Sequence, residues 1–94
     1  MPITVVIEFR ARPGRREELR SVLAGISATH GPSAPGYLGS SIHDTLDDEA
    51  GLVEIATWES AAAQAEAVQR AMTTGIYAPV IELVAEPFRA LRLG

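Results

Sequence analysis

The other elements of the chain can be placed around Gly51–Ser60, with the sequence GLVEIATWES, because an apolar strand here ends in the only tryptophan. Apolar side chains occur on both alternating faces of this strand, so we expect both faces to be covered. Ser60 is a suitable N-cap for the alanine-rich helix that begins at Ala61. Trp58 therefore lies where a strand leads into a helix, and the small alanines beside it leave room for a cavity. Two interpretations stay open: Trp58 lines that cavity, or it belongs to the ordinary core.

The composition is that of one globular domain spanning residues 1–94. Of the 94 residues 47% are hydrophobic and 21% are charged, and no repeat, linker or low-complexity tract divides the chain. A domain this short buries a modest fraction of its surface, so a second copy often completes the core. All 8 basic residues are arginine, and lysine and asparagine are absent, a bias that we associate with GC-rich bacterial genomes.

The charge and the missing residue types exclude several classes of function. A net charge of -4 argues against binding to the phosphate backbone of a nucleic acid. Without cysteine, the chain has no disulfide, no thiolate nucleophile and no cysteine-ligated metal. The opening MPITVVIEFR fits neither a signal peptide nor a membrane span. We therefore expect a cytoplasmic protein without a nucleic-acid or membrane partner.

Hydrophobic periodicity predicts the first elements. Residues Ile3–Ala11 alternate as a strand with one apolar face, and apolar residues recur at helical spacing from Arg15 to about Thr29. The segment His30–Gly39 is rich in proline and glycine and is predicted to be a loop. Leu38–Leu46 is predicted to be a second strand, which an acidic turn joins to the third as a hairpin.

The rest of the chain completes the pattern. Gly75 interrupts the alanine-rich helix, and Pro79 suits the first turn of a short helix that runs to about Ala85. Pro87–Leu93 supplies a last strand. The order strand, helix, strand, strand, helix, strand is the split βαβ arrangement of a ferredoxin-like α+β domain with a four-stranded antiparallel sheet.

If both helical layers pack on one side, the other face of the sheet is left bare. Alternation places five aliphatic side chains there, namely Val6, Val53, Ile55, Leu91 and Leu93. A monomer should not leave such a patch in water. We therefore predict a homodimer joined through the sheet faces.

Three short motifs, in their order along the chain, resemble the antibiotic biosynthesis monooxygenase superfamily of small dimeric α/β barrel proteins. They are Phe9–Gly14 before the first helix, Pro35-Gly36-Tyr37 before the second strand and Ile55–Ser60 at the end of the third. The superfamily includes cofactor-free oxygenases of aromatic polyketides and quinols. The resemblance implies a substrate pocket between sheet and helices, lined by Trp58, and no cofactor.

The superfamily also includes haem-degrading proteins, which use an asparagine on the first strand and a histidine after the tryptophan. Ile7 lies near the position expected for that asparagine, and no histidine follows His43, so haem degradation is disfavoured. The asparagine that the oxygenases use near their substrate is missing too. His30 is interpreted as a helix cap, and its spacing from His43 matches no metal motif, so we predict no metal.

Cofactor-free oxygenation requires a base in a dry pocket, because the anion of a phenol or hydroquinone can pass an electron to dioxygen. His43 is the first candidate, since imidazole titrates near neutral pH and the residue lies on the strand next to Trp58. Its other interpretation is a partly exposed strand histidine. We expect His43 and Trp58 to face one cavity. A bulge in the hairpin would instead turn His43 away, and Glu54 or Tyr77 would then transfer the proton.

Glu54 shares a face with Trp58, so it is the second candidate base. An apolar pocket would raise the pKa of its carboxyl group, whereas pairing with an arginine such as Arg92 would compensate its charge. The catalytic candidates are thus His43, Glu54 and Trp58.

Substrate contacts are expected from the strand and helix faces that meet at the pocket. The candidates are Phe9, Ile7, Tyr77, Val68 and Met72, of which Tyr77 has a boundary tyrosine as its alternative interpretation. The function predicted is a cofactor-independent monooxygenase of small aromatic phenols, anthrones or hydroquinones, with dioxygen as co-substrate. Two alternatives are a non-catalytic carrier or sensor of an aromatic ligand and a pure dimerisation module.

Overall fold

The computed structural model describes all residues from 1 to 94, and its elements occur in the predicted order. They are β1 (Ile3–Arg10), α1 (Arg16–His30), β2 (Tyr37–Asp44), β3 (Gly51–Trp58), α2 (Ala61–Thr74), α3 (Ala78–Leu83) and β4 (Arg89–Leu93). The predicted boundaries were wrong by one or two residues at most ends. The second strand begins at Tyr37, inside the segment expected to be a loop.

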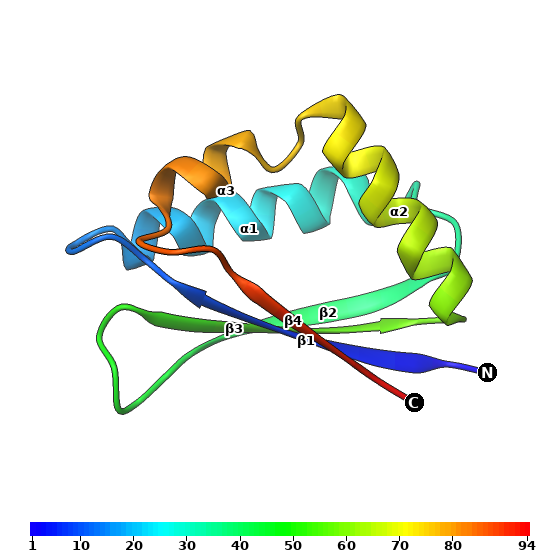
Figure 1. Ribbon diagram of the computed structural model, residues 1–94, viewed down its shortest axis with the longest axis horizontal. Helices are drawn as coiled ribbons and strands as arrows, with labels where there is room; N and C mark the ends of the chain where they lie inside the picture. Colours follow the sequence, from blue (N-terminus) through cyan, green and yellow to red (C-terminus); the bar gives the residue numbers. More distant parts are fainter.

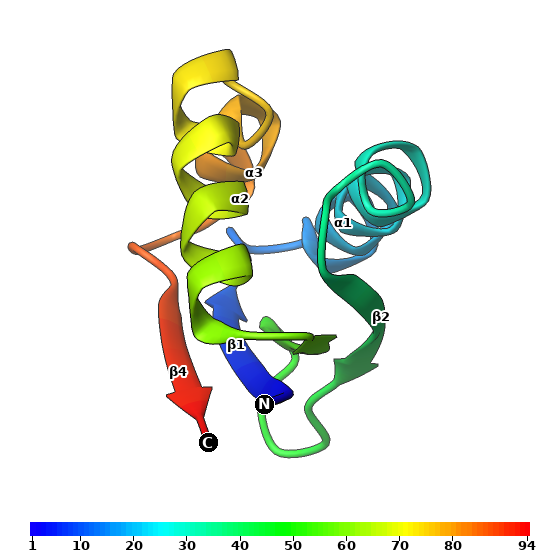
Figure 2. The same cartoon turned by 90° about the vertical axis from the view of Figure 1, so that its right-hand side faces the viewer.

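The four strands form one sheet in the order β2-β3-β1-β4, and every neighbouring pair is antiparallel. All three helices lie on one face of this sheet (Figure 1). Helix α1 lies over the β2 side, and α2 and α3 lie over the side of β1 and β4 (Figure 2). The predicted ferredoxin-like α+β fold is confirmed.

Three local sequence signals fix where the second helical layer starts and breaks. The Ser60 hydroxyl accepts a hydrogen bond from the backbone N–H of Ala63 at 3.1 Å, as expected of an N-cap. Gly75 ends α2 in the left-handed conformation with φ 73°, where a side chain would be strained. Pro79 lies in the first turn of α3, where its missing N–H is not needed. The layer is therefore two short helices at an angle.

A compact core fills one end of the space between sheet and helices. Its eight buried residues come from β1, α1, β3 and α3 and the segments beside them: Phe9, Ala11, Leu19, Leu23, Leu52, Val80, Leu83 and Val84. Leu19 of α1 and Val80 of α3 are fully buried, since apolar side chains at helical spacing turn toward the sheet. This end of the molecule, which we call the closed end, lies under α3 and the first half of α1.

The opposite face of the sheet carries no helix. Val6 of β1 pairs with Ile55 of β3 and with Leu91 of β4, so these aliphatic side chains share that face, as predicted. Ile55 is 38% exposed and Leu93 is 49% exposed. We expected both faces of β3 to be covered. Within one chain the helices cover only one of them, and the face that carries Ile55 has no covering element.

The helices are short. None of them is long and apolar enough to cross a membrane.

Candidate functional site

A cavity of about 270 Å³ lies between the sheet and the helices, at the end opposite the core. We call this region the open end. Its floor comes from β1 and β3 through Val5, Ile7 and Ala56, and its walls come from α1 and α2 through residues such as Ile26 and Val68. Most of the side chains that line it are apolar. The ribbons of α1 and α2 stand apart on this side of the molecule (Figure 2).

Trp58 lies at the end of β3 and lines this cavity, which decides between its two interpretations. Tyr37, directly opposite on β2, is its aromatic neighbour: the two ring centroids are 5.3 Å apart and the rings meet edge to face at 68°. The Tyr37 ring packs against Gly31 so closely that an added Cβ at Gly31 would lie 2.7 Å from Tyr37 Cε2. A glycine at the end of α1 is thus needed to admit the ring.

Glu54 presents its carboxylate to the cavity from the middle of β3. Its neighbours on the two flanking strands are Ile7 and Ile42, so the local surroundings are apolar. Burial raises the pKa of the Glu54 carboxyl group, and the hydroxyl groups of Ser27, which donates to the carboxylate, and of Ser40, which donates to Ser27, oppose this rise. No arginine or histidine forms an ion pair with this carboxylate, which makes it an uncompensated acid in a mainly apolar cavity.

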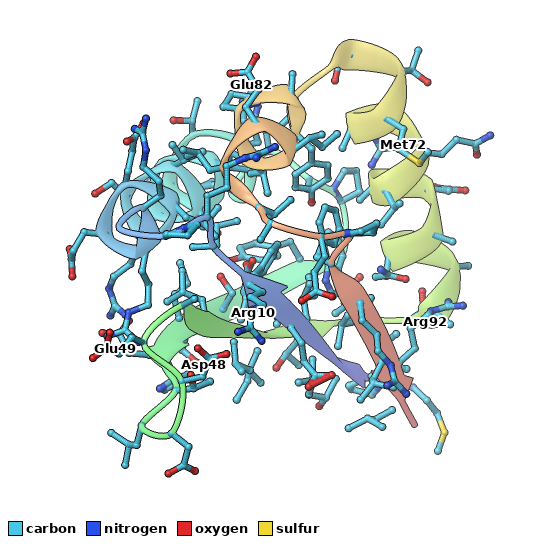
Figure 3. All side chains as sticks on the ribbon, turned by 60° about the vertical axis from the view of Figure 1, so that its left-hand side comes forward. Arg10, Asp48, Glu49, Met72, Glu82 and Arg92 are labelled. Atoms are coloured by element: carbon cyan, nitrogen blue, oxygen red, sulfur yellow. The ribbon has the colours of Figure 1, made fainter.

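The predicted alternative, an ion pair between Glu54 and Arg92, is wrong. Arg92 lies on the edge strand β4 (Figure 3), and its guanidinium donates to the backbone oxygen of Ala61 at 2.9 Å. Because β4 begins at Arg89 and pairs along β1, the long side chain reaches the start of α2 and not the middle of β3.

Two serine hydroxyl groups connect the carboxylate of Glu54 with the hydroxyl group of Tyr37. Ser27 Oγ of α1 donates to Glu54 Oε2 at 3.4 Å, and Ser40 Oγ of β2 donates to Ser27 Oγ at 3.4 Å. The Tyr37 hydroxyl and Ser40 Oγ are 2.6 Å apart. Sequence reasoning did not identify Tyr37, Ser27 or Ser40 as site residues, although Tyr37 belongs to the motif Pro35-Gly36-Tyr37.

Tyr77 lines the same cavity from the short connection between α2 and α3, as predicted. Burial raises the pKa of its hydroxyl group, and the negative charge of Glu54 raises it further. Tyr77 is therefore a neutral group that can donate a hydrogen bond at physiological pH. His30 and Arg70 also line the cavity, from the ends of α1 and α2 that are exposed to solvent.

The expectation that His43 shares a cavity with Trp58 is wrong. His43 pairs with Val53 of β3, on the sheet face without helices, and its Nε2 lies 2.9 Å from Ser41 Oγ. The physical reason is alternation: Ile42 packs against the core, so the residues on either side of it point to the opposite face. The imidazole of His43 is thereby separated from the cavity by the thickness of the sheet.

Of the five predicted substrate contacts, Ile7, Val68 and Tyr77 line the cavity. Phe9 does not, because it belongs to the core and its ring lies 5.1 Å from that of Phe88. Met72 lies on the outer side of α2 and is 74% exposed (Figure 3). Helical spacing placed Val68 and Met72 on one stripe, but α2 leans away from the sheet toward its end and leaves Met72 in solvent.

No group of three or more histidine, aspartate or glutamate side chains is arranged to hold a metal ion.

The antiparallel sheet, the helical layer on one face and the cavity between them define a ferredoxin-like α+β domain with an internal cavity. The sequence profile of the family described as antibiotic biosynthesis monooxygenase matches residues 2–74, and the chain belongs to this family. No functionally curated protein matches the chain.

Solved structures show the same fold at low sequence identity. Rv0793 from Mycobacterium tuberculosis is 23% identical with a TM-score of 0.82, over 100% of this chain and 94% of that one. A variant of SnoaB, a cofactor-independent oxygenase from Streptomyces nogalater, is 20% identical with a TM-score of 0.83, over 99% and 91%. A conserved protein from Methanosarcina mazei is 12% identical with a TM-score of 0.82, over 98% and 90%. The fold thus includes a cofactor-independent oxygenase.

Proposed function

We propose that the protein is a cofactor-independent monooxygenase that oxidises a small phenol, anthrone or hydroquinone in the cavity of the open end. The observation that carries the proposal is the uncompensated carboxylate of Glu54 in a mainly apolar cavity. A carboxylate with a raised pKa is a stronger base than one in water, and an apolar cavity favours electron transfer from a desolvated anion. Glu54, and not His43, is therefore the base that we propose.

With an anthrone as substrate, the product is the anthraquinone. Glu54 takes a proton from the substrate, and the anion passes one electron to dioxygen. The substrate radical and superoxide then combine into a peroxide, which is protonated. Glu54 then takes the second C–H proton as hydroxide leaves and passes that proton to the hydroxide, so one oxygen atom stays in the new carbonyl group and the other leaves as water. The substrate supplies both electrons that dioxygen needs, and no cofactor takes part.

The volume of the cavity limits the size of the substrate that it can hold. Its volume of about 270 Å³ is just below the range of roughly 300–1,000 Å³ that is usual for sites of drug-sized ligands. The rings of Trp58 and Tyr37 offer an edge against which a flat aromatic substrate can be oriented. A compact aromatic molecule with two or three fused rings fits these features.

Oxygen uptake by the purified protein tests this function, with a panel of anthrones and hydroquinones as substrates. We expect one dioxygen consumed per product and, with ¹⁸O₂, one labelled oxygen atom in the new carbonyl group. Saturable binding of the same compounds without oxygen uptake would contradict the proposal and favour a carrier or sensor of aromatic ligands. Neither binding nor uptake would favour a pure dimerisation module.

We further propose that two copies of the chain pack their bare sheet faces together. Ile55, Leu91 and Leu93 are partly exposed there, and their aliphatic surface favours burial against an equal surface. Light scattering should then report twice the chain mass of 10.0 kDa. A monomer at micromolar concentration would contradict this assembly without affecting the cavity within each chain.

A further inference from the structure

The hydroxyl chain between Tyr37 and Glu54 has no part in the reaction as described so far. Its two ends both reach the cavity, since Tyr37 and Glu54 line it from β2 and β3. Its middle is Ser27 and Ser40, which come from α1 and β2. Two groups that can exchange protons with a bound substrate are thus connected to each other through the protein.

The direction of the hydrogen bonds follows from counting hydrogens, because each hydroxyl group has only one to donate. Ser27 donates its hydrogen to Glu54, and Ser40 donates its hydrogen to Ser27. Ser40 can therefore only accept from Tyr37, so the tyrosine is the donor of the 2.6 Å bond. With Glu54 ionised, every O–H of the chain points toward the carboxylate, and Tyr37 offers the cavity only its lone pairs.

We propose that this chain is a proton relay that couples the two ends of the site, so that a proton accepted at Glu54 reverses the relay and makes Tyr37 a donor toward the cavity. A protonated carboxyl group is itself a donor and can turn its hydrogen toward Ser27. Ser27 and Ser40 then rotate in sequence, and Ser40 donates to the Tyr37 oxygen. The Tyr37 hydrogen is released from its bond and becomes free to point at bound ligand.

This inference rests on the proposed function and adds the acid step to it. After Glu54 has taken the first substrate proton, the peroxide anion needs one. Tyr37 gives its proton to the peroxide, and the tyrosine oxygen recovers a proton through Ser40 and Ser27 from Glu54. The carboxylate is thereby ionised again and ready to take the second C–H proton. Base and acid are one coupled unit, and no proton has to enter from solvent during the cycle.

Other titratable groups around the cavity stand outside this chain. Tyr77, His30 and Arg70 line it, but none of their side chains is hydrogen-bonded to Ser27, Ser40 or Tyr37. A charge change on them would act on Glu54 only through space. Changes at Tyr37 and Ser40, in contrast, should reach Glu54 through the hydrogen bonds.

Two readouts on the full chain test the relay. The first is titration of the Glu54 side-chain carbon by NMR in the wild type, Tyr37→Phe and Ser41→Ala. Ser41 is next to Ser40 on β2 but points to the other face, so it is the matched control. Phenylalanine keeps the ring against Trp58 and removes only the donor, so we expect the pKa of Glu54 to rise in Tyr37→Phe and to stay unchanged in Ser41→Ala. An unchanged Glu54 titration in Tyr37→Phe would overturn the relay.

The second readout is the rate of oxygen uptake. We expect Tyr37→Phe and Ser40→Ala each to lower kcat by about 10²-fold, and the double variant to lose no more than either single one, because members of one unit are not additive. Losses that multiply in the double variant, or full activity in Ser40→Ala, would overturn the relay. If the wild type shows no uptake with any substrate, the proposed function fails, and the titration alone then decides whether the chain couples its ends.

Discussion

The two ends of the space between the sheet and the helices are filled in different ways. At the closed end, leucine, valine and phenylalanine side chains from four elements leave no room, and Leu19, Leu52 and Val80 are fully buried. At the open end, the same sheet and the same helix α1 enclose a cavity with a carboxylate, two tyrosines and a tryptophan along its walls. The closed end holds most of the buried apolar packing, and the open end keeps the carboxylate of Glu54 without an ion-pair partner.

The difference comes from the helices that cover each end. Helix α3 lies against α1 over the closed end, whereas α2 stands apart from α1 at the other end (Figure 2). The cavity lies between α1 and α2 there. Because Gly75 ends α2, the chain changes direction before α3 begins, and the two helices cover different ends of the sheet. Substitutions at the two ends should therefore separate activity from stability.

The largest effect is expected from Glu54→Gln at the open end. Glutamine keeps the size of the side chain and an acceptor for Ser27 but removes the base, so oxygen uptake should fall by at least about 10²-fold. The melting temperature should not fall with it. Uptake that persists at the wild-type rate would remove Glu54 from the mechanism.

A comparison of Leu19→Ala with Ile26→Ala measures the packing of the two ends on one helix. Leu19 is fully buried, so its truncation should cost about 2–5 kcal/mol of unfolding free energy. Ile26 is half-buried beside the existing cavity, so its truncation should cost about 1–2 kcal/mol. Urea unfolding of both variants gives the two values. Equal losses would mean that the open end is packed as tightly as the core.

Trp58→Phe probes the wall of the cavity. Phenylalanine retains most of the apolar surface, so the cost in stability should be about 1–2 kcal/mol. The smaller ring fixes an aromatic substrate less well, and we expect kcat/KM to fall by roughly 10- to 100-fold. A variant with full activity would return Trp58 to a purely structural role.

The stability of Glu54→Gln should depend on pH relative to the wild type. Burial raises the pKa of the folded carboxyl group above its ordinary value of 4.5, so ionisation costs the folded state stability. Below pH 4.5 the carboxyl group is protonated in both folded and unfolded chains, and the two proteins should melt alike. As pH rises through the raised pKa, the wild type loses stability and the variant should melt higher at pH 7, by roughly 4–8 °C for each kcal/mol. A variant that melts lower at pH 7 would contradict the raised pKa.

The smallest effect is expected from His43→Ala. The imidazole is exposed on the far side of the sheet, so neither the rate of oxygen uptake nor its pH profile should change. Stability should stay within about 0.5 kcal/mol of the wild type. A loss of activity with an altered pH profile would place His43 back in the mechanism, through the second copy of a dimer.

The order of elements and the sheet were accessible from sequence because they depend on patterns that a single chain displays. Apolar periodicity gave the strands and α1, and Ser60, Gly75 and Pro79 marked the ends of helices correctly. The same alternation placed Val6 and Ile55 on one face. These features are local, so a reading of neighbouring residues is sufficient.

The site was only partly accessible because it depends on which strand faces meet. Glu54, Trp58 and Tyr77 were identified from their parity and position, and they do line one cavity. His43 was misplaced because a polar strand face looks the same whether it meets a cavity or solvent. Tyr37 was missed because it shares the sequence parity of His43, and only the irregular pairing of β2 turns it to the helix side.

That irregularity is a bulge at Leu38, where Tyr37 pairs with Trp58 and Gly39 already pairs with Thr57. Gly39 adopts φ 143° there, a backbone conformation that disfavours other residues. The extra residue lets Tyr37 and Ser40, an odd number of positions apart, point to the same side. If the same sequence paired without the bulge, Leu38 would lie opposite Trp58, and Tyr37 would turn to the outer face while Ser40 stayed in place. The register of β2 at this one position therefore separates a strand that completes the hydroxyl chain from one that holds only part of it.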